Sequence, residues 1–77
     1  MRIVKEADER KNEILDTAEE LFVVNGYDKT SIQEIIDKIG IAKGTFYYYF
    51  KSKEDLLNGI VERYNGIILR RALEIAE

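Results

Sequence analysis

A glycine between two short apolar-patterned segments is the feature that most constrains this fold. Residues 32–39 carry isoleucine at positions 32, 35, 36 and 39, which is the spacing of one buried helix face. Gly40 then ends that segment, and a second short helix is predicted from residue 42 or 43 to residue 50 or 51. Two short helices joined by about three residues, one of them glycine, have the form of a helix-turn-helix.

A longer helix is predicted before this pair, over about residues 7–25. Gly26 ends it, because glycine readily takes the left-handed conformation found after a helix C-terminus. The predicted buried stripe consists of Ile14, Leu15, Ala18, Leu21 and Phe22. The acids fall mainly on the opposite side, where we expect a solvated face: Glu13, Asp16, Glu19 and Glu20.

Two capping signals mark helix starts. Ser31 followed by Glu34 predicts a capping box for the helix over residues 32–39, with Thr30 and Gln33 as the competing register. A fourth helix is predicted to start at residue 52 by a similar pair, in which Ser52 is followed by Asp55.

The fourth helix is predicted to carry more apolar surface than the other three helices can cover. Its stripe is Leu56, Leu57, Ile60, Val61, Tyr64, Ile67 and Ile68, and further apolar residues widen it toward residue 76. Exposed apolar patches of this kind usually mark an interface, so we expect the end of this helix to pack on another domain or chain. Asn65–Gly66 is a turn signal by itself, but the stripe stays in phase across it and predicts a continuous helix.

Composition excludes several functions. The 77 residues contain no cysteine and no histidine, which removes thiolate metal sites and the commonest general base. No glycine-rich phosphate loop is present, and the carboxylate pairs belong to a solvated face or a helix start. We therefore expect neither enzymatic activity nor a cofactor or metal. The start lacks an apolar signal segment and no run could span a membrane, so a cytoplasmic protein is expected.

The stretch IAKGTFYYYFKSK, residues 41–53, contains three lysines, five aromatic residues and no acid. Such a mixture suits a surface that lies against phosphates and base edges, and a buried aromatic cluster is the alternative. Helical spacing favours a split, because Phe46 and Phe50 share one face while Tyr48 and Tyr49 point elsewhere. This basic face on a chain of net charge −3 can still bind DNA, with a modest salt dependence.

Residues 14–57 resemble the DNA-binding domain of the TetR family of bacterial transcriptional regulators. The resemblance rests on Leu21–Phe22, Gly26–Tyr27, Thr30–Ser31, Gly40, Lys43–Gly44–Thr45, Tyr47–Tyr48, Phe50 and Ser52–Lys53–Glu54. It implies an all-α, homeodomain-like fold, with a helix-turn-helix head over residues 1–51. Residues 52–77 would form a fourth helix that leads into a C-terminal regulatory domain outside this chain.

The resemblance also implies a function. It implies a sequence-specific DNA-binding regulator, most simply a ligand-responsive repressor, that works as a homodimer on a palindromic operator. A small-molecule inducer would bind the missing C-terminal domain, and the protein would act at the nucleoid of a bacterium or archaeon. The alternative is a helical protein–protein interaction module without DNA binding, which the acidic net charge and the apolar fourth helix favour.

Three departures from the family pattern stand out. Ala42 occupies a position where a small hydroxyl residue is usual, which removes a side-chain cap worth about 1 kcal/mol. Ile36 and Ile39 replace residues that are often alanine. Tyr49 stands where histidine is frequent, and a phenol can still donate to a phosphate oxygen.

Four residues are predicted to contact bases. Lys43 begins the second helix of the helix-turn-helix, which is the recognition helix that would face base edges. It can donate to guanine O6 or N7, unless it is only a solvated lysine. Gly44 lets the backbone approach DNA closely, unless it is only a flexible helix start. Tyr47 can touch base edges or thymine methyls, or be half-buried in the head, and Gln33 can reach a base from the second helix.

Five further residues are predicted to contact phosphates, which sets the position of the head without reading sequence. They are Ser31, Thr45, Tyr48, Tyr49 and Lys53. Thr45 could instead be a local cap, and Lys53 could be simply solvated. The expected core comprises Phe22, Ile35, Ile41, Phe46 and Phe50.

Overall fold

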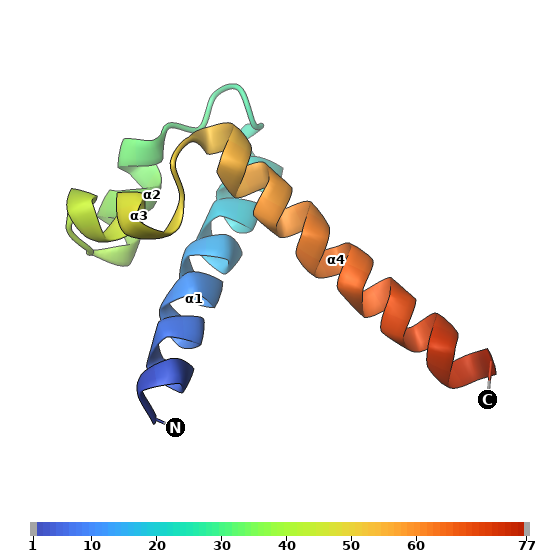
Figure 1. Cartoon of the computed structure of the whole chain (residues 1–77). Coiled ribbons are helices and arrows are strands. Elements are labelled where there is room, and N and C mark those ends of the chain that lie inside the picture. Colours follow the sequence, from blue (N-terminus) through green and yellow to red (C-terminus); the bar gives the residue numbers. More distant parts are fainter. Residues whose placement is uncertain (1, 77) are drawn as a thin grey trace.

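The structure, a computed structural model, describes the backbone of residues 2–76 and the side chains of residues 9–65. It contains α1 (Arg2–Asn25), α2 (Ile32–Ile39), α3 (Lys43–Tyr49) and α4 (Lys53–Ala76), with no strand among these residues. The all-α class is confirmed, and α1 begins five residues earlier than predicted. Figure 1 shows α2 and α3 beside one end of α1, while α1 and α4 diverge from this head. No helix in the described part of the chain could cross a membrane.

Local signals set the ends of α1 and α2. Gly26 and Gly40 take left-handed φ angles of 94° and 83°, as predicted for the residue after each helix. Ser31 caps α2: its Oγ accepts from the Glu34 amide at 3.1 Å, and the Glu34 carboxylate accepts from the Ser31 amide at 2.9 Å. The competing register from Thr30 is not used. The Thr30 hydroxyl is buried and donates to the carbonyl oxygen of Gly26 at 2.8 Å.

The core lies where the four helices meet. Its buried members are Ile14, Leu15, Ala18, Ile35, Ile36, Phe46, Phe50, Leu56 and Ile60. Ile35, Phe46 and Phe50 are buried as predicted, whereas Phe22 and Ile41 are only partly buried and pack against the core. The short helix α3 is therefore anchored by two phenylalanines, whose ring centroids lie 6.1 Å apart.

The start of α4 differs in one detail from the predicted capping box. Ser52 Oγ accepts from the Asp55 amide at 3.0 Å, as expected, but the Asp55 carboxylate accepts from the Lys51 amide at 2.9 Å instead of that of Ser52. The helix runs without interruption through Asn65–Gly66, as predicted. The apolar side chains from Ile67 onward, which were predicted to form an interface, lie outside the described side chains.

The acids of α1 lie at the surface but are paired with cations of the same chain, which the prediction of a simply solvated face missed. Glu13 binds Arg10 within α1, and Glu20 lies 3.6 Å from the Lys38 ammonium. Asp16 and Glu19 both bind Arg63 of α4. Much of the negative charge of α1 is therefore compensated locally.

Neighbouring aromatic residues of α3 should differ sharply in their contribution to stability. Phe46 is fully buried, so Phe46→Ala should lower the free energy of unfolding by roughly 3–5 kcal/mol. Tyr48 is 77% exposed, and Tyr48→Ala should change it by less than about 0.5 kcal/mol. Urea denaturation followed by circular dichroism measures both. Similar losses for the two variants would contradict this division of α3 into a buried and an exposed face.

Candidate nucleic-acid interface

Helix α3 has one face in the core and one face open to solvent. Phe46 is buried on the inner side, and Phe50, one turn later, caps the helix and is buried as well. Lys43, Gly44, Tyr47 and Tyr48 are exposed. The outer residues fall in two i, i+4 pairs and thus form one continuous surface. The predicted split of the aromatic stretch between core and surface is therefore confirmed for Phe46, Phe50 and Tyr48.

The start of α3 brings two of the predicted base-contacting residues, Lys43 and Gly44, together. Lys43 is the first residue of the helix, and Ala42 before it makes no side-chain capping bond. A Cβ atom added to Gly44 would meet nothing within 4 Å, and this residue has no left-handed φ. Neither packing nor backbone conformation within the head therefore requires glycine here. A requirement for glycine would have to come from a partner that approaches the backbone closely.

The other two residues predicted to contact bases are partly engaged within the head. Tyr47 is 37% exposed, and its ring packs edge-on against Phe46 with centroids 5.2 Å apart. Its hydroxyphenyl group thus combines an anchored ring with an accessible edge. Gln33 is exposed on α2, where its side-chain amide donates to Asp37 Oδ1 at 2.8 Å. A base contact by Gln33 would have to replace that bond.

The residues predicted to contact phosphates flank this surface. Ser31 is exposed at the start of α2, although its hydroxyl is already used in the capping box. Thr45 is half-buried, and Tyr48 packs edge-on against the half-buried Tyr49 with centroids 5.0 Å apart. Ser31, which precedes α2, and Tyr48, which lies in α3, are thus both accessible to a partner. Their phosphate contacts stay predictions.

Lys53 has a structural role that the sequence did not indicate. Its ammonium donates to the carbonyl oxygens of Tyr27 at 2.8 Å and Thr30 at 3.0 Å, and lies 4.5 Å from the centre of the Tyr27 ring. Lys53 therefore ties the first turn of α4 to the loop between α1 and α2. Its phosphate contact stays a prediction, but at least two of its three N–H groups are occupied within the head.

Thr30 holds the same loop from the other side. Its hydroxyl lies 3.2 Å from the carbonyl oxygen of Leu21 as well as 2.8 Å from that of Gly26. The loop that leads into Ser31 is thus fixed both to α1 and, through Lys53, to α4. The sequence suggested Thr30 only as the competing cap of α2, so its bonds to α1 were not predicted.

Charge is distributed favourably for an anionic partner. Lys43 and Lys51 are exposed at either end of α3, whereas Lys38 lies near Glu20 of α1. Among the described residues, no group of histidine, cysteine or carboxylate side chains has the arrangement of a metal site. The exposed surface of α3 therefore offers lysine ammonium groups, tyrosine hydroxyls and open backbone.

Comparison with known families decides where the chain belongs. Residues 14–60 match the family described as bacterial regulatory proteins, tetR family. The chain belongs to the TetR family. The matched residues run from the middle of α1 through the helix-turn-helix and into α4, and they include the exposed surface of α3.

Three relatives of this TetR-family chain are regulators, and two of them are of the HTH type. It is 44% identical over 69 residues to the uncharacterised HTH-type transcriptional regulator YerO of Bacillus subtilis (strain 168), which covers 90% of this chain and 24% of YerO. The fatty acid metabolism regulator protein of the same organism is 37% identical over 62 residues, or 80% of this chain and 32% of that protein. The HTH-type transcriptional regulator QacR of Staphylococcus aureus (strain Mu50 / ATCC 700699) is 48% identical over 46 residues, or 60% and 24%.

A solved structure agrees with the fold. The crystal structure of a transcriptional regulator of the TetR/AcrR family from Aquifex aeolicus VF5 superposes with a TM-score of 0.76 at 43% identity. The superposition covers 78% of this chain and 35% of the Aquifex aeolicus chain. The chain thus spans about a quarter to a third of the length of these relatives.

The position of Lys53 generates a prediction about the free protein. Lys53→Met keeps most of the side chain but removes the ammonium group, and should lower the free energy of unfolding by about 1–3 kcal/mol. Lys51→Met, two residues away at an exposed position, should leave it almost unchanged. Urea denaturation without DNA measures both. Equal stability of the two variants would mean that the bonds from Lys53 to the loop contribute nothing.

Proposed function

We propose that this chain is the DNA-binding part of a ligand-responsive transcriptional repressor. Residues 1–51 form the helix-turn-helix head and residues 52–77 the fourth helix, which leads into a regulatory domain. The observation that carries the proposal is the exposed surface of α3, where Lys43, Gly44 and Tyr47 lie together on a helix anchored by the core. Family membership and the regulators among its relatives support the same conclusion.

In this proposal α3 lies in the major groove. Lys43 donates to guanine O6 or N7, Tyr47 presents its ring edge to neighbouring bases, and Gly44 allows the backbone to come close. Gln33 reaches a base from α2 after releasing Asp37. Ser31, Thr45, Tyr48, Tyr49 and the remaining N–H of Lys53 hold phosphates and fix the position of the head.

The whole regulator is proposed to be a homodimer on a palindromic operator. Two heads then read half-sites about one turn of DNA apart, roughly 34–36 Å. A small-molecule inducer binds the regulatory domain, favours a state in which the heads are wrongly spaced, and so releases the operator. Such a regulator works in the cytoplasm of a bacterium or archaeon, at the nucleoid.

Salt dependence of DNA binding tests the proposal against the protein-interaction alternative. The chain by itself should bind random duplex DNA with a Kd of about 10⁻⁴ to 10⁻⁶ M at physiological salt. Neutralisation of two or three phosphates by lysine gives a slope of log K against log salt of about −2 to −3. Fluorescence anisotropy at several salt concentrations measures the slope. Absence of binding even at low salt would favour the interaction module.

Gly44 offers a sharper prediction, because stability and binding should change in opposite directions. Gly44→Ala meets no neighbour and replaces glycine in a helix, so stability should rise by up to about 1 kcal/mol. The added methyl group would stand where the DNA backbone or bases approach, so affinity for DNA should fall several-fold.

A matched control is available on α4. Asn58 is exposed there, and Asn58→Ala should also stabilise a helix by a few tenths of a kcal/mol while leaving DNA affinity unchanged. Chemical denaturation and fluorescence anisotropy are measured on both variants. Unchanged DNA affinity in Gly44→Ala would show that the start of α3 does not approach DNA closely.

A further inference from the structure

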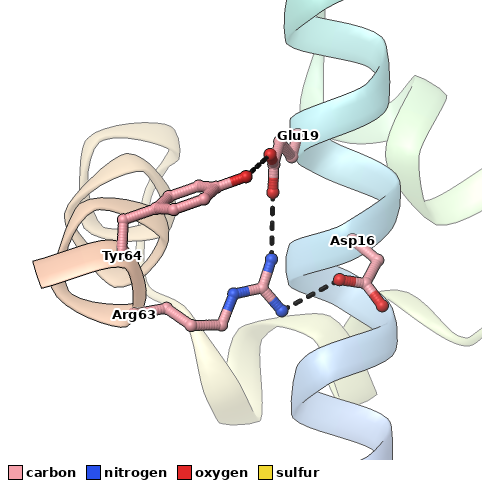
Figure 2. Close-up of polar contacts among 4 residues, drawn as sticks. All are labelled: Asp16, Glu19, Arg63 and Tyr64. Carbon is pink, nitrogen blue, oxygen red and sulfur yellow. Dashed lines mark hydrogen bonds and ion pairs between the residues drawn. The ribbon is translucent and has the colours of Figure 1, made fainter. Parts of the chain in front are cut away.

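Helix α4 reaches back to α1 on its third turn, beyond the apolar contacts of Leu56 and Ile60. Arg63 and Tyr64 of α4 meet Asp16 and Glu19 of α1, and these four residues are called the α1–α4 polar cluster below. Figure 2 shows them between the two helices, with the Arg63 guanidinium pointing at both carboxylates. The contacts join positions 44 to 47 residues apart in the sequence.

Each polar group in the cluster has a distinct partner. Arg63 Nη1 donates to Asp16 Oδ1 at 2.9 Å, and Nη2 donates to Glu19 Oε1 at 3.0 Å. The Tyr64 hydroxyl donates to the other oxygen of Glu19, Oε2. That hydrogen bond to the carboxylate raises the pKa of Tyr64 above its ordinary value. Glu19 is thus bound by two consecutive residues of α4, one through each oxygen.

A close contact lies one helical turn before the cluster. A Cβ atom on Gly59 would lie 3.1 Å from the Phe50 ring and 3.2 Å from Leu15 Cδ2. Gly59 therefore lets α4 pack closely against α1 and the end of α3. Gly59 and Arg63 are i, i+4 and share one side of α4. The bonds from Arg63 thus extend the apolar packing of α4 by one further turn, which restrains the angle between α1 and α4 more than the packing near Gly59 does by itself.

An ordinary surface ion pair contributes little to stability, because both side chains are mobile and hydrated. This cluster differs in two respects. The side chains of Arg63 and Glu19 are only 26% and 30% exposed, and Arg63 is held by two carboxylates at once. Asp16, in contrast, is 71% exposed. The cluster is thus partly shielded from water at Arg63 and Glu19 and open to water at Asp16.

We propose that Asp16, Glu19, Arg63 and Tyr64 are positioning residues that fix the direction in which α4 leaves the head. The proposal deepens the proposed function, because in a dimer this direction sets the separation of the two heads. An effector that opened the cluster would change that separation without altering α3. Allosteric couplings commonly change affinity by about 5- to 150-fold.

The distance between α1 and α4 tests the proposal directly, without DNA. The chain contains no cysteine, so Glu9→Cys and Asn65→Cys provide two exposed sites for spin labels within it. Pulsed electron paramagnetic resonance then gives the distribution of label separations. The parent should show one narrow distance. Arg63→Met and Glu19→Gln should replace it with a broader or shifted distribution, while circular dichroism shows unchanged helix content.

Glu13→Gln is the matched control. It removes an ion pair of the same helix, but one that Glu13 makes with Arg10 inside α1, so the distance distribution should stay narrow. Tyr64→Phe removes a single hydroxyl and decides the question if Arg63→Met fails to fold. It should broaden the distribution less than Glu19→Gln does, because Arg63 remains bound.

An unchanged distribution in Arg63→Met, Glu19→Gln and Tyr64→Phe would overturn the proposal and assign the direction of α4 to the packing around Leu56, Gly59 and Ile60. Since the measurement contains no DNA, its outcome is independent of whether the head binds DNA. A narrow parent distance that only the cluster variants broaden would support the positioning role, even for a chain that failed the salt test.

Discussion

Burial of two phenylalanines one helical turn apart is the constraint on which the rest of this molecule depends. α3 has only seven residues, too few to be stable as an isolated helix in water. Phe46 and Phe50 hold it by entering the core formed with Ile14, Leu15, Ile35 and Leu56. Because these two residues occupy the inner side, Lys43, Gly44, Tyr47 and Tyr48 are left on the outer side, while Tyr49 is half-buried against the core. The same packing that makes α3 stable thus makes its opposite face available.

The acidic net charge is reconciled with DNA binding by where the acids lie. Three of them on α1 are paired with Arg63 and Lys38, and a fourth with Arg10. Charges farther than about 8 Å from a phosphate are largely screened at physiological salt. A phosphate at the surface of α3 therefore interacts mainly with nearby Lys43 and Lys51, although the net charge of the chain is negative.

Features encoded by neighbouring residues were predictable, and features made by distant residues were not. The bounds of α2, its Ser31 cap and the glycines after α1 and α2 follow from signals a few residues long. The sequence also placed Phe46 and Tyr48 on opposite faces, by helical spacing alone. The bonds from Lys53 to the loop and from Arg63 to α1 join residues 23 to 47 positions apart. No local pattern marks such pairs. Lys53 was therefore predicted to contact phosphate, and Asp16 and Glu19 to face water, although all three have partners inside the head.

The location of the DNA contact is the central claim, and nuclear magnetic resonance can map it residue by residue. The ¹⁵N-labelled chain is titrated with a short duplex, and the shift of each backbone amide is followed. The account predicts that the largest changes cluster at residues 31–33 and 43–48, while amides beside Asp16 and Val23 on α1 change little. Changes centred on the exposed Val23, Val24 and Val61 instead would contradict it, because the binding surface would then lie away from α3.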